Sequence, residues 1–354
     1  MYNKIYFYVR RIWFSLSKPV RSKLAEGYKA FHRRIWSVAM KYTPFGKTGL
    51  LVSEIALGTW GIGGAGWDQN SEETRLDAIR SAIESGINFI DTAPAYNGGV
   101  AEDYVGRVVQ EMGVRKDVYL VTKCGTEFID GKYVRSCARD TILRECETSL
   151  QNLRTDYIDL YLIHWPDASV PIAETMDALR LLKQQGKILH IGVSNFSKAQ
   201  IIEASKYCPI EAYQPQYSMI FRSNEPQMRW AHSQGIGVMC YGSLGAGILT
   251  GTYRKRPKFN PSDNRSRFYK HFKEPMFSRI MKLVELMDVI SEAHGGIPLA
   301  QIAINWATQK DFVASSIVGV QHRERIMENC NSFDWELTPE ESAILDAAIR
   351  LYLE

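Results

Sequence analysis

From Met40 onward, short apolar runs alternate with longer segments whose apolar residues recur at helical spacing. The runs are rich in β-branched and aromatic residues and predict strands, whereas the longer segments predict amphipathic helices. Eight strands that alternate with helices indicate an α/β protein, a (β/α)8 TIM barrel. The predicted strands are 54–57, 88–92, 118–123, 158–164, 189–194, 212–216, 237–241 and 315–319, and the predicted helices include 72–85, 139–153, 172–185, 198–206 and 281–294.

Two stretches depart from this alternation. Residues 45–51, with Gly46 and Gly49 at turn positions, predict an N-terminal β-hairpin that plugs the barrel bottom. Residues 252–275 carry eight basic side chains and three prolines between the last two strands. We expect this basic loop at the barrel mouth, where it either covers a phosphorylated ligand or is an ordinary solvated loop.

The first 39 residues differ in composition from the rest. They hold nine basic side chains and one acid, so the net charge of +4 conceals a balance of −4 in the remainder and does not indicate nucleic-acid binding. Arg10 and Arg11 break the longest apolar run, which leaves it too short to span a membrane. We expect one barrel domain over 40–354, with 1–39 a basic aromatic extension that is disordered or lies upstream of the native start. Peripheral contact of this extension with an anionic membrane is the less favoured alternative.

Composition points to a soluble enzyme, with 45% hydrophobic and 23% charged residues. The six cysteines show no CxxC pairing and no neighbouring histidines. This pattern favours free thiols in a reducing compartment, and therefore a cytoplasmic protein without a structural metal.

Four polar residues stand at or just after the ends of predicted strands: Asp91, Tyr96, Lys123 and His164. Parallel strands in a closed barrel bring such positions together at one mouth, where these barrels carry their chemistry. Taken singly, each has an ordinary structural explanation, and Lys123 alone also suits a Schiff-base aldolase. Together, an acid, a phenol, an ammonium and an imidazole can deliver a proton to a carbonyl oxygen. None of them is an electron source, which implies a cofactor.

Six motifs occur in a fixed order along the chain, each at a predicted strand end or in a connecting loop. These motifs are Gly58-Thr59-Trp60-Gly61, Phe89-Ile90-Asp91-Thr92-Ala93-Pro94-Ala95-Tyr96, Val121-Thr122-Lys123, Asp159-Leu160-Tyr161-Leu162-Ile163-His164-Trp165-Pro166, Ile191-Gly192-Val193-Ser194-Asn195-Phe196 and Glu328-Asn329. With them, the chain resembles the aldo-keto reductases over essentially all of residues 40–353, and the ordered set is far more specific than any single motif.

The resemblance implies a role for each of the four residues. Tyr96 would be the general acid, and the Lys123 ammonium would lower the pKa of its phenol from about 10. Asp91 would hold Lys123 against Tyr96. His164 would bind the substrate carbonyl or relay the proton.

The resemblance also implies a nicotinamide cofactor bound across the mouth without a Rossmann domain. Ser194, Asn195 and Gln214 match residues that hold the carboxamide, and Tyr241 matches the aromatic residue that stacks on the ring. Further matching positions lie along the rest of the cofactor: Leu244 and Gly247 at the pyrophosphate, Arg325, Glu328 and Asn329 around the adenosine half, and Thr59, Trp60, Asp91, Gly319 and Gln321 among the remaining contacts.

The chain departs from many relatives after the last strand. Gln321 stands where a basic residue often binds the adenosine 2′-phosphate. Arg325 is the first remaining candidate for that contact, and Arg323 or His322 is the second. Because an Arg fork suits a phosphate, we expect NADP(H), with NAD(H) as the alternative.

We expect an oxidoreductase that transfers a hydride between NADP(H) and an aldehyde or ketone, with no nucleic-acid partner. Its substrate pocket would have an aromatic wall suited to flat or apolar aldehydes and ketones. Two alternatives remain, a cofactor-sensing regulatory subunit with little turnover and the Schiff-base aldolase. The expected wall consists of Trp60, Trp67, Trp165, Phe196 and Tyr217.

Overall fold

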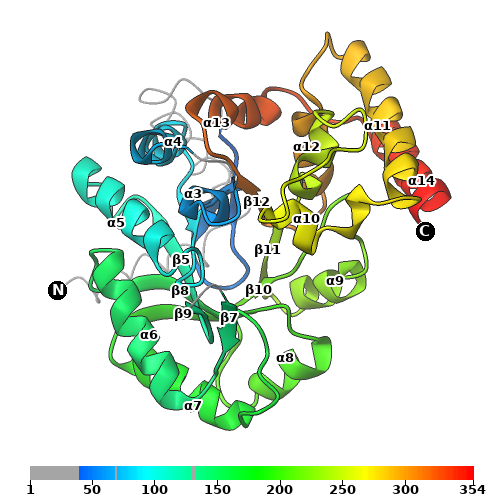
Figure 1. The fold of residues 1–354 in the computed structure, drawn as a ribbon. Helices are drawn as coiled ribbons and strands as arrows, with labels where there is room; N and C mark the ends of the chain where they lie inside the picture. The colour runs from blue at the N-terminus through cyan, green and yellow to red at the C-terminus, as the bar shows by residue number, and fades with distance from the viewer. Residues whose placement is uncertain (1–39, 68–69, 130–131) are drawn as a thin grey trace, which may run out of the picture.

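The computed structural model describes residues 40–67, 70–129 and 132–354, and for residues 127–129 it describes the backbone alone. The expectations for residues 1–39 lie outside these ranges. Eight parallel strands close into a barrel, which confirms the predicted fold (Figure 1). The strands, in order around the barrel, are β3 (Ile55–Gly58), β4 (Phe89–Asp91), β5 (Tyr119–Cys124), β8 (Ile158–Ile163), β9 (Ile188–Ser194), β10 (Ala212–Gln214), β11 (Gly237–Tyr241) and β12 (Ser315–Gly319). Each lies within two residues of its predicted bounds.

Helices connect the strands and surround the barrel (Figure 1). The predicted helix 281–294 begins earlier, at Met276, because the chain enters it directly after Pro275. Across the described part of the chain, every helix is too short or too polar to span a bilayer. The helices are α3 (Trp60–Gly63), α4 (Glu72–Glu84), α5 (Val100–Met112), α6 (Arg139–Asn152), α7 (Ile172–Gln184), α8 (Lys198–Ala204), α9 (Glu225–Ser233), α10 (Asn264–Phe268), α11 (Met276–Ala293), α12 (Leu299–Thr308), α13 (Arg323–Cys330) and α14 (Pro339–Leu353), with 3₁₀ turns η1 (Gly245–Thr250), η2 (Lys270–Phe272) and η3 (Asn331–Asp334).

The predicted hairpin consists of β1 (Tyr42–Pro44) and β2 (Leu51–Ser53), joined by the turn at 45–50. Phe45 is fully buried, and its ring packs edge-on against Phe89 of β4 at 5.2 Å between centroids. Gly46 has a φ of +53°, and a Cβ there would lie 2.4 Å from the Gly237 backbone nitrogen. The turn therefore needs glycine to seat Phe45 in the barrel bottom.

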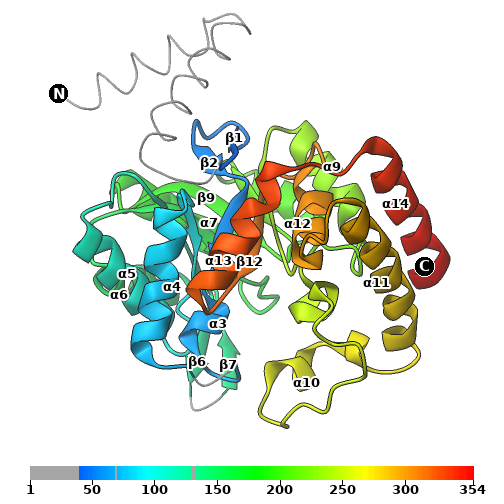
Figure 2. The same cartoon turned by 90° about the horizontal axis from the view of Figure 1, so that it is seen from above.

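A second hairpin, which the sequence pattern did not indicate, follows β5. It pairs β6 (Thr126–Ile129) with β7 (Lys132–Arg135). Figure 2 shows this hairpin and α10 at one end of the barrel, with the β1–β2 hairpin at the other. The mouth is therefore flanked by segments from distant parts of the chain.

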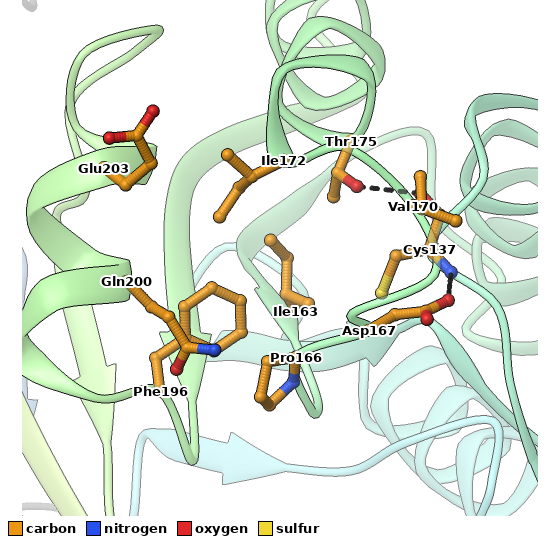
Figure 3. A pocket seen from close by; sticks show the side chains of 10 residues that line it. All are labelled: Cys137, Ile163, Pro166, Asp167, Val170, Ile172, Thr175, Phe196, Gln200 and Glu203. Carbon is orange, nitrogen blue, oxygen red and sulfur yellow. Dashed lines mark hydrogen bonds between the residues drawn. The ribbon is translucent and has the colours of Figure 1, made fainter.

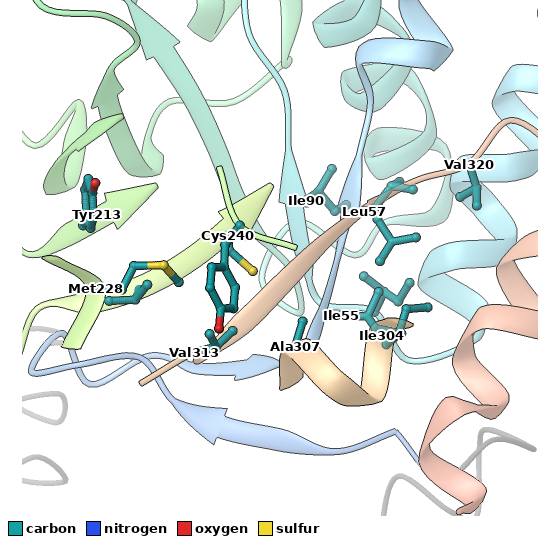
Figure 4. Packing of buried hydrophobic residues seen from close by; sticks show 14 of the residues in the cluster. Ile55, Leu57, Ile90, Tyr213, Met228, Cys240, Ile304, Ala307, Val313 and Val320 are labelled. Atoms are coloured by element: carbon teal, nitrogen blue, oxygen red, sulfur yellow. The ribbon is translucent and has the colours of Figure 1, made fainter. Parts of the chain in front are cut away.

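Alternation along the strands divides the apolar residues into two cores. The larger core lies between the barrel and its helices and includes Ile55, Leu57 and Ile90 (Figure 4). The smaller core fills the barrel interior, with members such as Phe89 and Val121. Because alternate residues share a face, the interior positions next in line toward the mouth are those at the ends of the strands.

Candidate active site

Lys123 and Asp91 form the centre of the site. Asp91 lies two residues beyond the interior residue Phe89, and Lys123 lies two beyond Val121, so both side chains point into the barrel. The Lys123 ammonium donates to both carboxylate oxygens of Asp91 at 2.9 Å and to the Thr92 carbonyl at 2.8 Å. Its side chain is fully buried.

Tyr96 completes this arrangement from the loop after β4. The Lys123 ammonium lies 3.2 Å from the Tyr96 hydroxyl. Asp91 is held in turn by the Gln214 amide, which donates to Oδ1 at 2.7 Å. The Thr59 hydroxyl and backbone N–H both donate to the Asp91 carbonyl, at 3.0 and 3.1 Å.

The expected direction of the Tyr96 pKa is wrong. Burial of the hydroxyl, followed by the negative charge of Asp91, raises the pKa of Tyr96 well above its usual 10. Burial also lowers the pKa of Lys123, against the opposing effect of Asp91. The ammonium is thus already balanced by Asp91, and desolvation outweighs its effect on the phenol. Tyr96 holds its proton through the neutral range.

His164 lies one residue beyond β8, with its ring centroid 6.0 Å from that of Tyr96. Burial, with the positive charges of Lys123 and Arg135, lowers the pKa of His164 well below 6.5. The imidazole is therefore neutral at physiological pH. Its buried Nδ1 has no hydrogen-bond partner among the described residues. The four residues that the sequence predicted are brought together, with a ring atom left to bind another group.

Further round the rim, a network of amides and hydroxyls joins the positions predicted to hold a nicotinamide. The Asn195 amide donates to Ser194 Oγ and to the His164 carbonyl, each at 3.0 Å. The Tyr241 hydroxyl donates to Asn195 Oδ1 at 2.8 Å, and Ser194 Oγ donates to the Gln214 carbonyl at 2.8 Å. Asn195 has a φ of +60°, so the chain turns sharply just after β9.

The loop after β11 contains successive residues with positive φ, at Gly245 (+56°), Ala246 (+54°) and Gly247 (+92°). Runs of this kind turn backbone N–H groups toward one side and form concavities that suit anions. Leu244 immediately precedes this loop, and His271 binds the Gly245 carbonyl at 3.0 Å. The loop thus fits the predicted pyrophosphate position.

At the positions predicted to surround the adenosine half of the cofactor, the arginines already have acidic partners. Arg323 pairs with Asp77 and with Glu84, both on α4. Arg325 pairs with Glu328, but its side chain is 64% exposed. The Gln321 amide donates to the Gly61 carbonyl at 2.7 Å. Of the remaining positions at this end, Gly319 is exposed and Asn329 is buried.

Residues 54–350 match the model of the Aldo/keto reductase family. This chain belongs to that family. An aldo-keto reductase of Bacillus subtilis, YhdN, is 36% identical over 303 residues, which cover 85% of this chain and 91% of the relative. An NADH-specific methylglyoxal reductase of Escherichia coli is 31% identical over 322 residues, which cover 86% of this chain and 97% of the relative.

Among solved structures, a glycerol dehydrogenase of Gluconobacter oxydans superposes with a TM-score of 0.80. It is 31% identical and covers 89% of this chain and 95% of its own. This aldo-keto reductase is therefore an oxidoreductase of carbonyl compounds, in a family that uses NAD(P)H. Its donor set fits that cofactor, because amides, an aromatic ring and an anion-binding loop follow one another around the rim.

The aromatic wall of this aldo-keto reductase is only partly as expected. Trp60 lies nearly parallel to Tyr96, with 6.3 Å between centroids, and contacts Trp67 edge-on at 5.1 Å. Trp165 lies beside His164, beneath the guanidinium of Arg135. These three tryptophans reach the mouth.

Phe196 points elsewhere. The left-handed turn at Asn195 directs its ring outward, where it lines a cavity of about 160 Å³ with Ile163, Ile172 and Cys137 (Figure 3). Tyr217 is also placed elsewhere, because its fully buried ring stacks on Trp306 of α12, outside the barrel. Neither residue lines the mouth, so the expectation for both is wrong.

Two aromatic residues at the mouth were missed from the sequence. The ring centroid of Phe268 in α10 lies 6.1 Å from that of Trp60, and the ring centroid of Tyr133 in β7 lies 6.4 Å from that of Phe268. Both belong to segments that the sequence did not place at the end of a predicted barrel strand.

The basic loop at 252–275 does reach the mouth, as expected. Asn264 donates from its backbone to the Gly66 carbonyl at 2.9 Å and from its side chain to the Ala65 carbonyl at 3.0 Å.

Proposed function

We propose that this protein reduces aldehydes or ketones to alcohols with NADPH, and that Tyr96 is the general acid. The observation that supports this most directly is the contact of the Tyr96 hydroxyl with Lys123, whose ammonium is bound by Asp91. When bound, the nicotinamide supplies the hydride. The phenol supplies the proton to the carbonyl oxygen.

Each of the four residues has one task in this proposal. Tyr96 is protonated at neutral pH, as an ordinary phenol is, and burial raises its pKa further. Lys123 stabilises the phenolate that forms when the proton leaves, and Asp91 keeps the ammonium in place. Neutral His164 binds the substrate oxygen through a ring nitrogen and fixes its orientation toward Tyr96.

The same contacts favour the reductase over the Schiff-base aldolase. All the hydrogen-bonding capacity of the Lys123 ammonium is directed at Asp91, Thr92 and Tyr96. A nucleophilic amine needs a free lone pair, which a buried ammonium in an ion pair lacks. Failure of borohydride to trap a carbonyl compound on Lys123 would agree with this assignment.

NADPH remains the proposed cofactor because Arg325 is exposed and can exchange Glu328 for a phosphate. We also propose that residues 40–354 form one domain and that the protein is cytoplasmic, which its six free cysteines support.

The test follows the loss of absorbance of reduced cofactor with a panel of aldehydes. Tyr96→Phe should lower kcat by about 10²–10⁴-fold, because it removes only the proton donor. Cofactor affinity, measured by quenching of tryptophan fluorescence, should stay unchanged. Tyr207→Phe, at an exposed tyrosine after α8, is the matched control. Full activity in Tyr96→Phe would refute the acid role, and tight cofactor binding without turnover of any carbonyl would favour the regulatory subunit.

A further inference from the structure

The β6–β7 hairpin carries an aromatic residue and a cation to the mouth. Its register pairs Phe128 with Tyr133 and Thr126 with Arg135, so Tyr133 and Arg135 belong to the same face of the hairpin. Figure 2 shows the hairpin at the end of the barrel that also carries α10.

Aromatic rings lead from this hairpin to the reacting hydroxyl. Tyr133 contacts Phe268, Phe268 contacts Trp60, and Trp60 lies over Tyr96, with centroid distances of 6.4, 6.1 and 6.3 Å. Tyr133 is 44% exposed and Phe268 is 51% exposed. Large exposed aromatic residues gathered beside a site indicate a surface for an apolar ligand.

Arg135 places a positive charge next to this surface. Its guanidinium carbon lies 4.9 Å from the centroid of Trp165, the residue after His164. Its charge also contributes to the low pKa of His164. Arg135 is exposed and forms no ion pair with any residue whose side chain the structure describes. Asp167 lies within its electrostatic influence, but the two oxygens of that carboxylate accept from Cys137 and Ser169.

Arginines elsewhere on the molecule behave differently. Arg254 and Arg265, both in the basic loop, pair with Asp288 and Asp263. An arginine beside the site without such a partner, over an aromatic ring, has its planar donor fork available for an anion.

The cofactor does not explain this cation. The groups predicted to hold the nicotinamide and the pyrophosphate lie on β9 to β11 and on the loops after β9 and β11, whereas the hairpin extends from β5. Three further predicted cofactor contacts, Thr59, Trp60 and Asp91, lie at the ends of β3 and β4. Strands β5 and β11 are four places apart in the ring of eight. Arg135 therefore flanks the half of the mouth that the cofactor leaves to the substrate.

We propose that the substrates of this enzyme are aromatic carbonyl compounds that carry a carboxylate, and that Arg135 binds this carboxylate. The inference rests on the proposed reductase activity and narrows its substrate class. The ring of the substrate packs among Trp60, Tyr133 and Phe268, its carbonyl group meets Tyr96, and its carboxylate accepts from the Arg135 guanidinium.

The experiment compares 3- and 4-carboxybenzaldehyde with their uncharged methyl esters as substrates. For the wild type, kcat/KM should be higher for the acid than for the ester of at least one pair. Arg135→Gln should lower kcat/KM for that acid by about tenfold, since a hydrogen bond to a charged group is lost. The ester should change by less than about twofold. Arg135→Lys should keep part of the preference because it keeps the charge without the fork.

Arg229→Gln is the matched control, since Arg229 also lies over an aromatic ring, 4.2 Å from Phe312, but belongs to α9 and has acidic partners. It should leave both substrates unaffected. Equal kcat/KM for acids and esters in the wild type, or an equal loss for both in Arg135→Gln, would overturn this inference while the reductase activity stands. If no aldehyde is reduced at all, the proposed function itself fails.

Discussion

The Lys123 ammonium lies 2.9 Å from both carboxylate oxygens of Asp91, and neither side chain is appreciably exposed to solvent. Two opposite charges have thus been moved out of water at the centre of the barrel mouth. Their mutual attraction offsets the loss of hydration only while both partners are present.

Removal of one partner should therefore cost more stability than removal of both. Asp91→Asn should lower the free energy of unfolding by about 3–5 kcal/mol, because a buried ammonium is left without its counter-charge. The double variant Asp91→Asn/Lys123→Met should recover part of that loss. Urea unfolding of the wild type, both single variants and the double variant measures the cycle. A double variant no more stable than Asp91→Asn would contradict the explanation.

His164 makes a second prediction, on pH. Its folded pKa lies well below 6.5, so the unfolded chain binds a proton that the folded protein does not. Stability from this group is complete above the unfolded pKa of about 6.5 and is lost as the pH falls toward the folded value. Between pH 7 and 5.5 this loss amounts to about 1 kcal/mol.

The measurement is urea unfolding at several pH values from 5.5 to 7. His164→Gln should have a flatter pH dependence than the wild type, by about that amount. His232→Gln, at an exposed position of α9, serves as the control and should keep the slope of the wild type. Identical slopes in wild type and His164→Gln would show that the imidazole is not held neutral by the fold.

A third prediction concerns the choice of cofactor. Arg325→Gln should raise KM for NADPH by roughly fivefold, the effect of one exposed ionic contact, and leave KM for NADH unchanged. Arg323→Gln should not change this preference, because the Arg323 guanidinium is engaged by Asp77 and Glu84. Steady-state kinetics with both cofactors provide the values. The NADPH assignment would be rejected if the wild type had the same KM for NADH and NADPH and if Arg325→Gln changed neither value.

The convergence of the four central residues could be predicted from the sequence because the ends of the strands in a parallel barrel meet at one mouth. For Asp91, Lys123 and His164, the prediction required only the correct strand assignments and the rule that every second residue of a strand points to the same face. Phe196 and Tyr217 were misplaced because this alternation stops where the strand does. The positive φ of Asn195 turns the following ring outward, and Tyr217 lies beyond the end of β10.

The pKa shifts and the ion pairs were harder to predict from the sequence. The shift of the Tyr96 pKa depends on how far burial outweighs Lys123, which spacing along the chain does not reveal. The partners of Arg323 come from α4, more than two hundred residues earlier. Pairings of this kind follow from the packing of α13 on α4 and have no local sequence signal.

The alternation inside the barrel also joins two properties that are usually treated separately. Asp91 is anchored two residues above Phe89, and Lys123 two above Val121, with one interior layer beneath both. Because a close-packed interior transmits even a change of one methyl group, a substitution in that layer should shift the side chains above it. We expect a substitution at Phe89 or Val121 to change the distance between the Lys123 ammonium and the Tyr96 hydroxyl before it unfolds the barrel. The interior core thus positions Asp91 and Lys123 as well as holding the fold together.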